Sequence, residues 1–383
     1  MIPYGRQDIT QADIDAVVAA LRSDFLTQGP AVPAFEQAVA RLAGATHAVA
    51  VNSATSALHI ACASLGLGPG DRFWTSPITF VASANCGVYC GASVDFVDID
   101  PHTYNISAEA LADKLAAAER AGILPKVIVA VHMCGQSCDM AAIGALARRY
   151  GVKVIEDASH AIGGRYRDAP IGNCAYSDVA VFSFHPVKIV TTAEGGMALT
   201  NDPELAARMA MLRTHGITRD PARMTHAPDG PWYYQQVDLG WNYRMTDLQA
   251  ALGLSQLDRL DDYVARRHGH ARAYDTAFAG LPLTCPWQHP DSHSALHLYV
   301  VQLDDPTRHR AVFEGLRARG IGVNLHYIPV HLQPFYRAMG FGAGDFPAAE
   351  DYYARAISLP MYPTMTEAQG DSVVRAMCAE LAQ

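Results

Sequence analysis

Short apolar runs alternate with amphipathic segments between residues 46 and 200. The runs rich in β-branched residues predict strands, and the segments with apolar positions three to four residues apart predict helices. The expected strands are 47–51, 72–75, 93–97, 126–131, 153–155 and 179–183, and the expected helices are 54–67, 81–89, 108–120 and 140–150. Because strands joined through helices pair in parallel, this alternation predicts a mostly parallel sheet with helices on both faces.

The rest of the chain has more helical pattern and fewer strands. We expect helices at 203–214, 246–270, 308–319 and from 366 onward, and strands at 297–303 and 323–328. Residues 219–241, rich in proline, glycine and aromatic residues, predict a loop. A helix at 10–22 is expected to pack across both parts of the chain, with a free arm as the alternative. The predicted domains are a large one over 1–250, including the N-terminal segment, and a small C-terminal α+β one over 251–383.

Composition narrows the class of protein. Half of the 383 residues are apolar and 17% are charged, which is typical of a globular chain with large buried surfaces. The net charge of −9 disfavours a nucleic-acid partner, which would require clustered basic residues. No apolar run reaches the roughly 18 residues that span a bilayer, and the first residues lack a signal peptide. We therefore expect a cytoplasmic protein with no membrane partner.

The cysteines and histidines do not favour a metal site. All eight cysteines are expected to be reduced thiols, as in a reducing compartment. The pairs closest to a metal motif are Cys86/Cys90 and Cys134/Cys138, and their spacing is wrong for a C-x2-C knuckle. His326 and His331 could be imagined as ligands, but no carboxylate or cysteine completes their set, so hydrogen bonding or simple packing is preferred. We predict no metal.

Lysine is scarce in this chain, and one lysine has unusual surroundings. Of the 29 basic residues, only Lys114, Lys126, Lys153 and Lys188 are lysines. Lys188 lies in the apolar stretch Phe-Ser-Phe-His-Pro-Val-Lys-Ile-Val (182–190), where an ammonium group would have to lose its water. A primary amine kept in such a place is a candidate for amine chemistry.

Reactive residues follow several of the predicted strands. In an open parallel sheet, ligands bind beyond the carboxyl ends of the strands. The first strand is followed by Asn-Ser-Ala-Thr-Ser-Ala (52–57), which forms either an ordinary helix cap or a phosphate site at a helix N-terminus. Asp157 and His160 follow a later strand, where the carboxylate could cap a helix or pair with a protonated heteroaromatic nitrogen. The glycines 195–196 allow close approach to a ligand or make a turn.

Five segments together carry a resemblance to a known family. They are Asn-Ser-Ala-Thr-Ser-Ala-Leu (52–58), Glu-Asp-Ala-Ser-His-Ala (156–161), Ser-Phe-His-Pro-Val-Lys (183–188), Glu-Gly-Gly (194–196) and Gly-Trp-Asn-Tyr-Arg-Met (240–245). In this order they resemble the sugar aminotransferases of the DegT/DnrJ/EryC1/StrS family, over residues 2 to about 363. The resemblance implies an aspartate-aminotransferase-like α/β fold, that is, fold type I of the pyridoxal 5'-phosphate enzymes, with a large mostly parallel-sheet domain and a smaller C-terminal α+β domain. One departure is Ile189, where many relatives have proline.

The resemblance also implies roles for individual residues. Lys188 would hold pyridoxal phosphate as a Schiff base and then act as the base, and Asp157 would pair with the pyridine nitrogen. Phe80 would cover one face of the ring, and His160 would lie near the other face or the phenolic oxygen. The implied phosphate ligands are Thr55, Ser56, Ser183 and, from the second subunit of a homodimer with shared sites, Asn242. The candidate sugar contacts are Tyr4, Leu26, Thr27, Gln28, Asn242, His326 and Tyr327.

The expected reaction moves the amino group of L-glutamate onto C4 of a UDP-linked 4-keto-6-deoxy-N-acetylhexosamine. Segments 2–7, 23–29 and 323–329 resemble the subgroup that works in pseudaminic acid biosynthesis. The alternatives are another nucleotide-sugar 3- or 4-aminotransferase, a pyridoxamine-dependent sugar dehydratase, and a non-catalytic binding protein on the same fold. A dehydratase is disfavoured because such enzymes lack the Schiff-base lysine, which is present here as Lys188.

Overall fold

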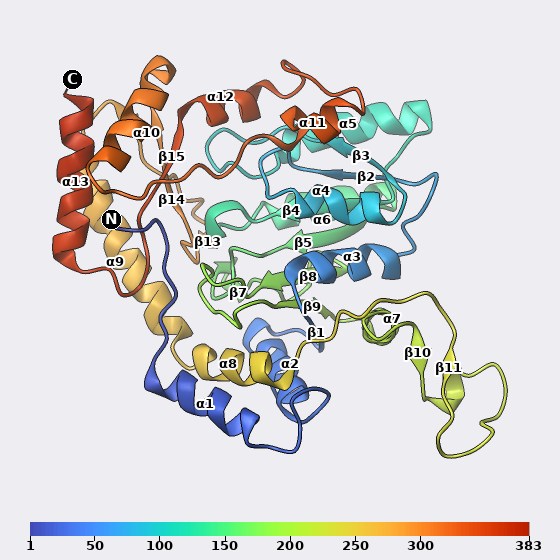
Figure 1. Cartoon of the computed structure of the whole chain (residues 1–383). Helices are drawn as coiled ribbons and strands as arrows, with labels where there is room; N and C mark the ends of the chain where they lie inside the picture. The colour runs from blue at the N-terminus through green and yellow to red at the C-terminus, as the bar shows by residue number, and fades with distance from the viewer. Residues whose placement is uncertain (383) are drawn as a thin grey trace.

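A seven-stranded, mostly parallel sheet forms the centre of the larger part of the molecule (Figure 1). A computed structural model describes residues 1–382. The strand order is β1-β9-β8-β5-β4-β2-β3, and β9 alone runs antiparallel to its neighbours β1 and β8. The strands are β1 (His47–Val51), β2 (Arg72–Thr75), β3 (Ser93–Phe96), β4 (Val127–Val131), β5 (Lys153–Asp157), β8 (Val179–Ser183) and β9 (Gly196–Thr200). This arrangement confirms the expected α/β class.

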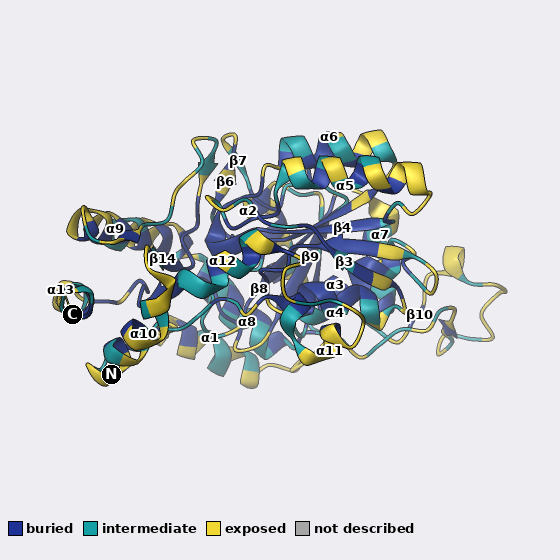
Figure 2. Cartoon of the chain, turned by 90° about the horizontal axis from the view of Figure 1, so that it is seen from above, coloured by how far each residue is buried: buried dark blue, intermediate teal, exposed yellow. Residues whose placement is uncertain are grey.

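Helices cover both faces of this sheet (Figure 2). Helices α3 (Ala54–Ser64) and α4 (Ala82–Tyr89) lie on one face, and α5 (Ala108–Ala121) and α6 (Met140–Tyr150) lie on the other. In β4, Val127 and Val129 join the core under α3 and α4, whereas Ile128 joins the core under α5 and α6. Successive side chains of a strand point to opposite faces, so a strand buried on both faces is apolar throughout.

A second core lies beside the large sheet. Three antiparallel strands, β12 (Leu283–Thr284), β14 (Tyr299–Leu303) and β15 (Ala356–Leu359), pack with α9 (Leu260–Phe278), α10 (His309–Ala318) and α13 (Glu367–Leu381). The N-terminal segment touches both parts, because Ile2 pairs with Ile321 whereas α1 (Gln11–Leu21) packs on α8 (Asp247–Leu257). It is therefore not a free arm.

The remaining elements are short or peripheral. They are α2 (Ala31–Ala43), α7 (Pro203–Leu212), α11 (Pro334–Arg337), α12 (Pro347–Arg355), β6 (Arg165–Tyr166), β7 (Ala169–Pro170), β10 (Ile217–Thr218), β11 (Gln235–Gln236), β13 (Ser292–His293) and the 3-10 turns Met133–Gly135, Pro221–Arg223, Pro306–Arg308 and Val330–Leu332. Residues 219–241, called the arm below, project from the body beyond β10 and β11 (Figure 1). None of the helices described within residues 1–382 combines the length and apolar character needed to cross a bilayer.

Several sequence-based expectations about elements were wrong. The single helix expected over 246–270 is two helices, because the chain turns at Asp258 and Arg259, where Arg259 binds Asp13 of α1. The strand expected at 323–328 is irregular, with only Asn324 paired, to Ser358. Helix α2 and strands β9 and β15 were not anticipated. Strand β9 follows directly on a glycine pair, which by itself indicates a turn.

Candidate active site

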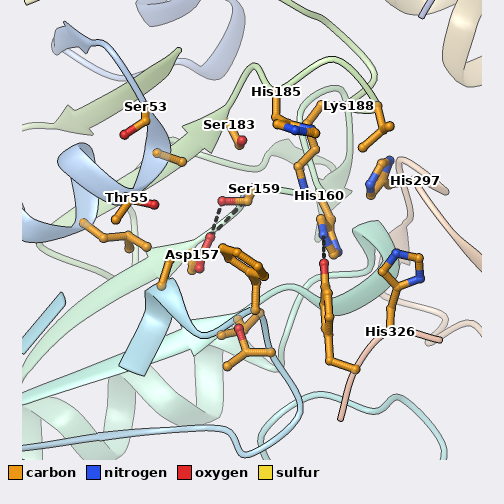
Figure 3. Close-up of a pocket in the computed structure, with 18 of the residues that line it drawn as sticks. Ser53, Thr55, Asp157, Ser159, His160, Ser183, His185, Lys188, His297 and His326 are labelled. Carbon is orange, nitrogen blue, oxygen red and sulfur yellow. Dashed lines mark hydrogen bonds between the residues drawn. The ribbon is translucent and has the colours of Figure 1, made fainter. Parts of the chain in front are cut away.

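A cavity of about 570 Å³ opens at the carboxyl ends of the central strands. Its walls come from the ends of β1, β5 and β8, the loop before β9, and the segment 324–327 beside the second core. Figure 3 shows Ser53 and Thr55 at one end and His297 and His326 at the other, with Asp157 and His160 between them. This is the place where an open parallel sheet binds ligands.

The phosphate end of the cavity is the N-terminus of α3. Ser53 caps the helix by accepting a hydrogen bond from Ser56 N, so the first helical N–H groups at residues 54 and 55 stay available beside the cavity. Free N–H groups and the helix dipole favour an anion there. Thr55 and Ser183 line the cavity as expected. Ser56 does not, because its buried hydroxyl donates to Asn52 Oδ1 at 2.7 Å, and Ser53 stands in the wall instead.

The glycine pair before β9 serves the chain itself. A Cβ on Gly196 would lie 2.5 Å from backbone atoms of Ser53 and Ala54, so only glycine lets β9 pass this close to the start of α3. The sequence left close approach to a ligand or a turn as the options. The close approach is real, but it is to the backbone of the 53–54 turn, and it shapes the phosphate end of the cavity.

Asp157 ends β5 with its carboxylate at the cavity, and Glu156 points the other way. Asp157 Oδ2 accepts a hydrogen bond from Ser83 at 2.6 Å, and Oδ1 accepts one from Ser159 at 2.5 Å. On the opposite face of the sheet, Glu156 is held by His132 at 2.8 Å and by Ser177. Because successive side chains of a strand point to opposite faces, the carboxylate of Asp157 lies in the cavity and that of Glu156 lies in the core.

Lys188 lies in the loop between β8 and β9. The loop is closed by backbone bonds from Thr192 N to Phe184 O and from Phe184 N to Gly195 O. Burial lowers the pKa of the Lys188 amine to about 8, although the nearby Asp157 charge acts in the opposite direction. Across residues 1–382, no hydrogen-bond or ion-pair partner is recorded for its Nζ. A desolvated, unpaired amine of this kind is available for chemistry at neutral pH.

Three imidazoles surround the far end of the cavity. The rings of His160 and His297 lie 4.5 Å apart, and His160 Nε2 lies 3.2 Å from the Tyr327 hydroxyl. Burial, with the Lys188 charge as a further cause, lowers the pKa of His160 and His297 and brings that of His326 to about 3. All three rings are therefore neutral near pH 7, and they can donate or accept hydrogen bonds without adding charge.

Phe80 lies at the mouth of the cavity and is 57% exposed. Its ring centroid is 6.2 Å from that of Tyr327. A large aromatic ring left open on a cavity wall is a natural surface on which to stack a flat ligand. The structure thus places Phe80 where the sequence-based expectation needs it.

Other predicted sugar contacts divide into two groups. Tyr4, His326 and Tyr327 line the cavity. Leu26, Thr27, Gln28 and Asn242 do not. Residues 26–28 lie at the start of α8, where Thr27 pairs with Thr246 and Leu26 O accepts a bond from Asp247 N, whereas Asn242 pairs with Thr214. Within a single chain these four residues are outside the site.

The sequence reasoning missed part of the cavity wall. The missed residues are Ser53, Thr79, Ser159, His185, Glu194, His297 and Asn324. Ser159 and His185 stand inside segments that were singled out, so their position there was an available signal. His297 had none, because it comes from a strand-like apolar stretch 137 residues after His160.

The groups that line the cavity match those needed to bind pyridoxal phosphate. It offers a helix N-terminus for a phosphate, a carboxylate for a ring nitrogen, an exposed aromatic ring and a desolvated amine of lowered pKa. His160 and His297 each also have a buried Nδ1 without a partner in the described chain, and a bound ligand can satisfy such atoms. Within residues 1–382, no group of three or more His, Cys, Asp or Glu is arranged to hold a metal ion.

Comparisons with known proteins agree with this arrangement. A sequence model described as the DegT/DnrJ/EryC1/StrS aminotransferase family matches residues 7–378. The chain is 42% identical to the spore coat polysaccharide biosynthesis protein SpsC of Bacillus subtilis (strain 168), over 98% of this chain and 96% of SpsC.

Two solved structures have nearly the same fold. Spr1654 of Streptococcus pneumoniae, a proposed sugar aminotransferase solved in PMP and PLP forms, is 28% identical; its PMP form gives a TM-score of 0.91 and covers 100% of this chain and 99% of its own. Helicobacter pylori PseC, an aminotransferase involved in the biosynthesis of pseudaminic acid, is 30% identical, with a TM-score of 0.90 and coverage of 100% and 99%.

Proposed function

The chain belongs to the DegT/DnrJ/EryC1/StrS aminotransferase family and is a pyridoxal-phosphate-dependent enzyme, and from this premise we propose that it moves the amino group of L-glutamate onto C4 of a UDP-linked 4-keto-6-deoxy-N-acetylhexosamine. The pathway we propose is pseudaminic acid biosynthesis. The likeness to Helicobacter pylori PseC supports this choice, as do the segments 2–7, 23–29 and 323–329 that resemble the same subgroup.

The observation that carries the proposal is that a desolvated amine and a carboxylate line the same cavity. Lys188 is partly exposed, burial lowers the pKa of its amine to about 8, and the nearby Asp157 charge acts in the opposite direction. Both line the same cavity as the N-terminus of α3. A regulatory binding protein would have no need to hold a desolvated amine beside a carboxylate.

The chain's own residues divide the work of the reaction. Bound pyridoxal phosphate supplies an electron sink next to the transferred nitrogen. Lys188 would take a proton from the donor carbon and return it to the carbon on the other side of the transferred nitrogen, and would later do the reverse on the sugar. Asp157 accepts a hydrogen bond from the ring nitrogen and keeps it protonated. The start of α3, with Thr55 and Ser183, binds the phosphate.

The wall opposite the phosphate end is suited to a sugar. Tyr4, Asn324, His326 and Tyr327 line the cavity there, and all of them are polar and uncharged at neutral pH. Hydroxyl groups are recognised by such neutral donors and acceptors. This composition supports a keto sugar as the amino acceptor.

A panel assay tests the substrate assignment. The purified enzyme should be given ¹⁵N-labelled L-glutamate and a set of UDP- and dTDP-linked 3-keto and 4-keto sugars. We expect ¹⁵N at C4 of the 4-keto-6-deoxy-N-acetylhexosamine, together with 2-oxoglutarate. Exclusive labelling of a 3-keto sugar, or of a sugar without the N-acetyl group, would overturn the assignment.

We further propose a cytoplasmic homodimer in which each chain completes the other's site. Residues 26–28 lie at the start of α8 and Asn242 lies beside Thr214, and none of them lines its own chain's cavity, as expected for residues that serve a partner. Large apolar side chains are exposed nearby and on the arm: Ile14, Leu21, Phe25, Leu26, Trp232, Tyr234, Val237 and Leu239. The described cysteines are all free thiols, which fits a reducing compartment.

A further inference from the structure

The carboxylate of Asp157 accepts three hydrogen bonds from other groups of the chain. Ser83 Oγ donates to Oδ2 at 2.6 Å, whereas Oδ1 receives both the Ser159 hydroxyl at 2.5 Å and the Ser159 N–H at 3.1 Å. Figure 3 shows the Ser159 contact beside the cavity. The three donors come from two segments, because Ser83 belongs to α4 and is 74 residues away in the sequence.

An ionised carboxylate offers about four lone-pair positions for hydrogen bonds. The chain's own donors fill three of them around Asp157, two on Oδ1 and one on Oδ2. One position on Oδ2 is left, and Asp157 is part of the cavity wall. Because Oδ1 is already filled, a ligand donor has to approach Oδ2.

Thr79 extends this arrangement by one residue. Its hydroxyl lies 2.6 Å from that of Ser83, and both side chains are buried, with Ser83 at 0% exposure. Ser83 has a single hydroxyl proton, and the acceptor-only carboxylate takes it, so Thr79 must be the donor to Ser83. The bonds then run in one direction, from Thr79 through Ser83 to Asp157, and bonds in such a chain polarise one another.

We propose that Ser83 and Ser159, with Thr79 behind Ser83, are positioning residues that aim the free Oδ2 lone pair of Asp157 at the ring nitrogen of pyridoxal phosphate. The inference rests on the proposed function, since it assumes the pairing of Asp157 with that nitrogen. Thr79 and Ser83 flank Phe80, and Ser83 N bonds to Phe80 O at 3.2 Å. The segment 79–83 therefore positions both the Asp157 carboxylate and the Phe80 ring, which the flat cofactor would contact.

The test compares two ligands that differ only at the ring nitrogen. Pyridoxamine 5'-phosphate has the nitrogen, and its 1-deaza analogue has carbon in that place. We expect Ser83→Ala to weaken binding of pyridoxamine phosphate about tenfold, because a misaligned Asp157 loses the charge-assisted hydrogen bond from the ring nitrogen, and to leave binding of the deaza analogue unchanged. Equilibrium dialysis of the full-length protein gives both dissociation constants, and the ¹⁵N shift of labelled pyridoxamine phosphate reports protonation of its ring.

Matched variants separate positioning from damage to the fold. Ser137→Ala removes another buried hydroxyl, one that donates to Cys138 O outside the cavity, and should change neither constant. Ser159→Ala should repeat the selective loss and serves if Ser83→Ala does not fold; Thr79→Val should give a smaller loss of the same kind. Equal losses for both ligands, or no loss, would overturn the inference. A wild-type protein that binds neither ligand would instead contradict the proposed function.

Discussion

At the scale of single residues, the chemistry depends on one amine that must be neutral and one carboxylate that must be charged. Burial disfavours both charged forms, and the two groups differ in the hydrogen-bond partners that the protein gives them. No partner within residues 1–382 hydrogen-bonds to the Lys188 Nζ, and burial lowers the pKa of this amine although the Asp157 charge raises it. Asp157 is supplied with hydroxyl and amide donors, which stabilise a carboxylate in a dry place.

The reactivity of Lys188 should follow its lowered pKa. Only the unprotonated amine attacks an aldehyde, so the rate at which the protein captures pyridoxal phosphate should rise with pH, pass half-maximum near the pKa of about 8, and level off above it. Stopped-flow absorbance measures this rate. Because the Asp157 charge raises the pKa of Lys188, Asp157→Asn should move the midpoint to lower pH, whereas Asp178→Asn, at the Lys153 surface pair, should not. A midpoint near the ordinary lysine value of 10.5 would contradict the desolvated amine.

Asp157 and its neighbour Glu156 should respond differently to loss of charge. Asp157→Asn should reduce kcat by about a hundredfold or more with the fold intact, as is usual when a preorganised charge contact to the reacting system is removed. Glu156→Gln faces the other side of the sheet and breaks the buried contact with His132, so it should lower the unfolding midpoint and spare kcat. Circular dichroism and steady-state kinetics distinguish the two. Near-normal turnover of Asp157→Asn would remove its assigned role.

At the scale of elements, α1 is attached to the large part by one buried carboxylate. Asp13 accepts two bonds from Arg259 Nη2, at 2.8 and 2.7 Å, and further bonds from Thr10 and Gln256. Arg259 stands at the bend between α8 and α9. The same contact therefore fixes the N-terminal helix and the change of direction between two helices that the sequence pattern presented as one.

Removing that carboxylate should cost stability. Asp13→Asn leaves the Arg259 charge with a weaker partner, and we expect the free energy of unfolding to fall by about 2–4 kcal/mol. Asp15→Asn, on the exposed side of the same helix, should change it by less than about 0.5 kcal/mol. Urea unfolding followed by circular dichroism measures both. Equal effects of the two variants would show that the Asp13–Arg259 contact does not hold α1.

At the scale of the whole molecule, a single chain leaves large apolar side chains exposed. The arm projects from the body, with Trp232 73% and Leu239 74% exposed. Several large apolar side chains exposed on one segment are typical of a surface that contacts another protein. Residues 26–28 and Asn242, which we assign to a second chain's site, and the exposed apolar side chains of the arm are both available for contact with that second chain.

Mixed variants test the shared site. Lys188→Ala and Asn242→Ala should each be nearly inactive, but after subunit exchange one site of each hybrid dimer has both residues, so activity should return to about one quarter of wild type. The matched mixture of Lys188→Ala and Ser183→Ala should stay inactive, because those two residues line the cavity of one chain. Failure of the first mixture after proven exchange would show that each chain is self-sufficient.

The sequence by itself determined the α/β class and the segments that carry the chemistry. Apolar strands and amphipathic helices are local patterns, and a parallel sheet brings its strand ends to one edge, so the 52–57 run, Asp157 and Lys188 could be expected at one site before any coordinates. The family resemblance added Thr55 and Ser183 as individual phosphate ligands. The family match and the structural neighbours confirm the fold class, the aminotransferase activity and the cofactor.

Only the tertiary structure decided the contacts between segments that are distant in sequence. The donation of Ser83 to Asp157, the approach of His297 to His160, the close passage of Gly196 by the 53–54 turn and the antiparallel course of β9 leave no local pattern, because each depends on how whole elements pack. The turn of Ser56 away from the cavity has the same origin, since the capping bonds of α3 decide which hydroxyl faces the ligand. Side-chain direction follows packing, and packing is settled by the complete fold.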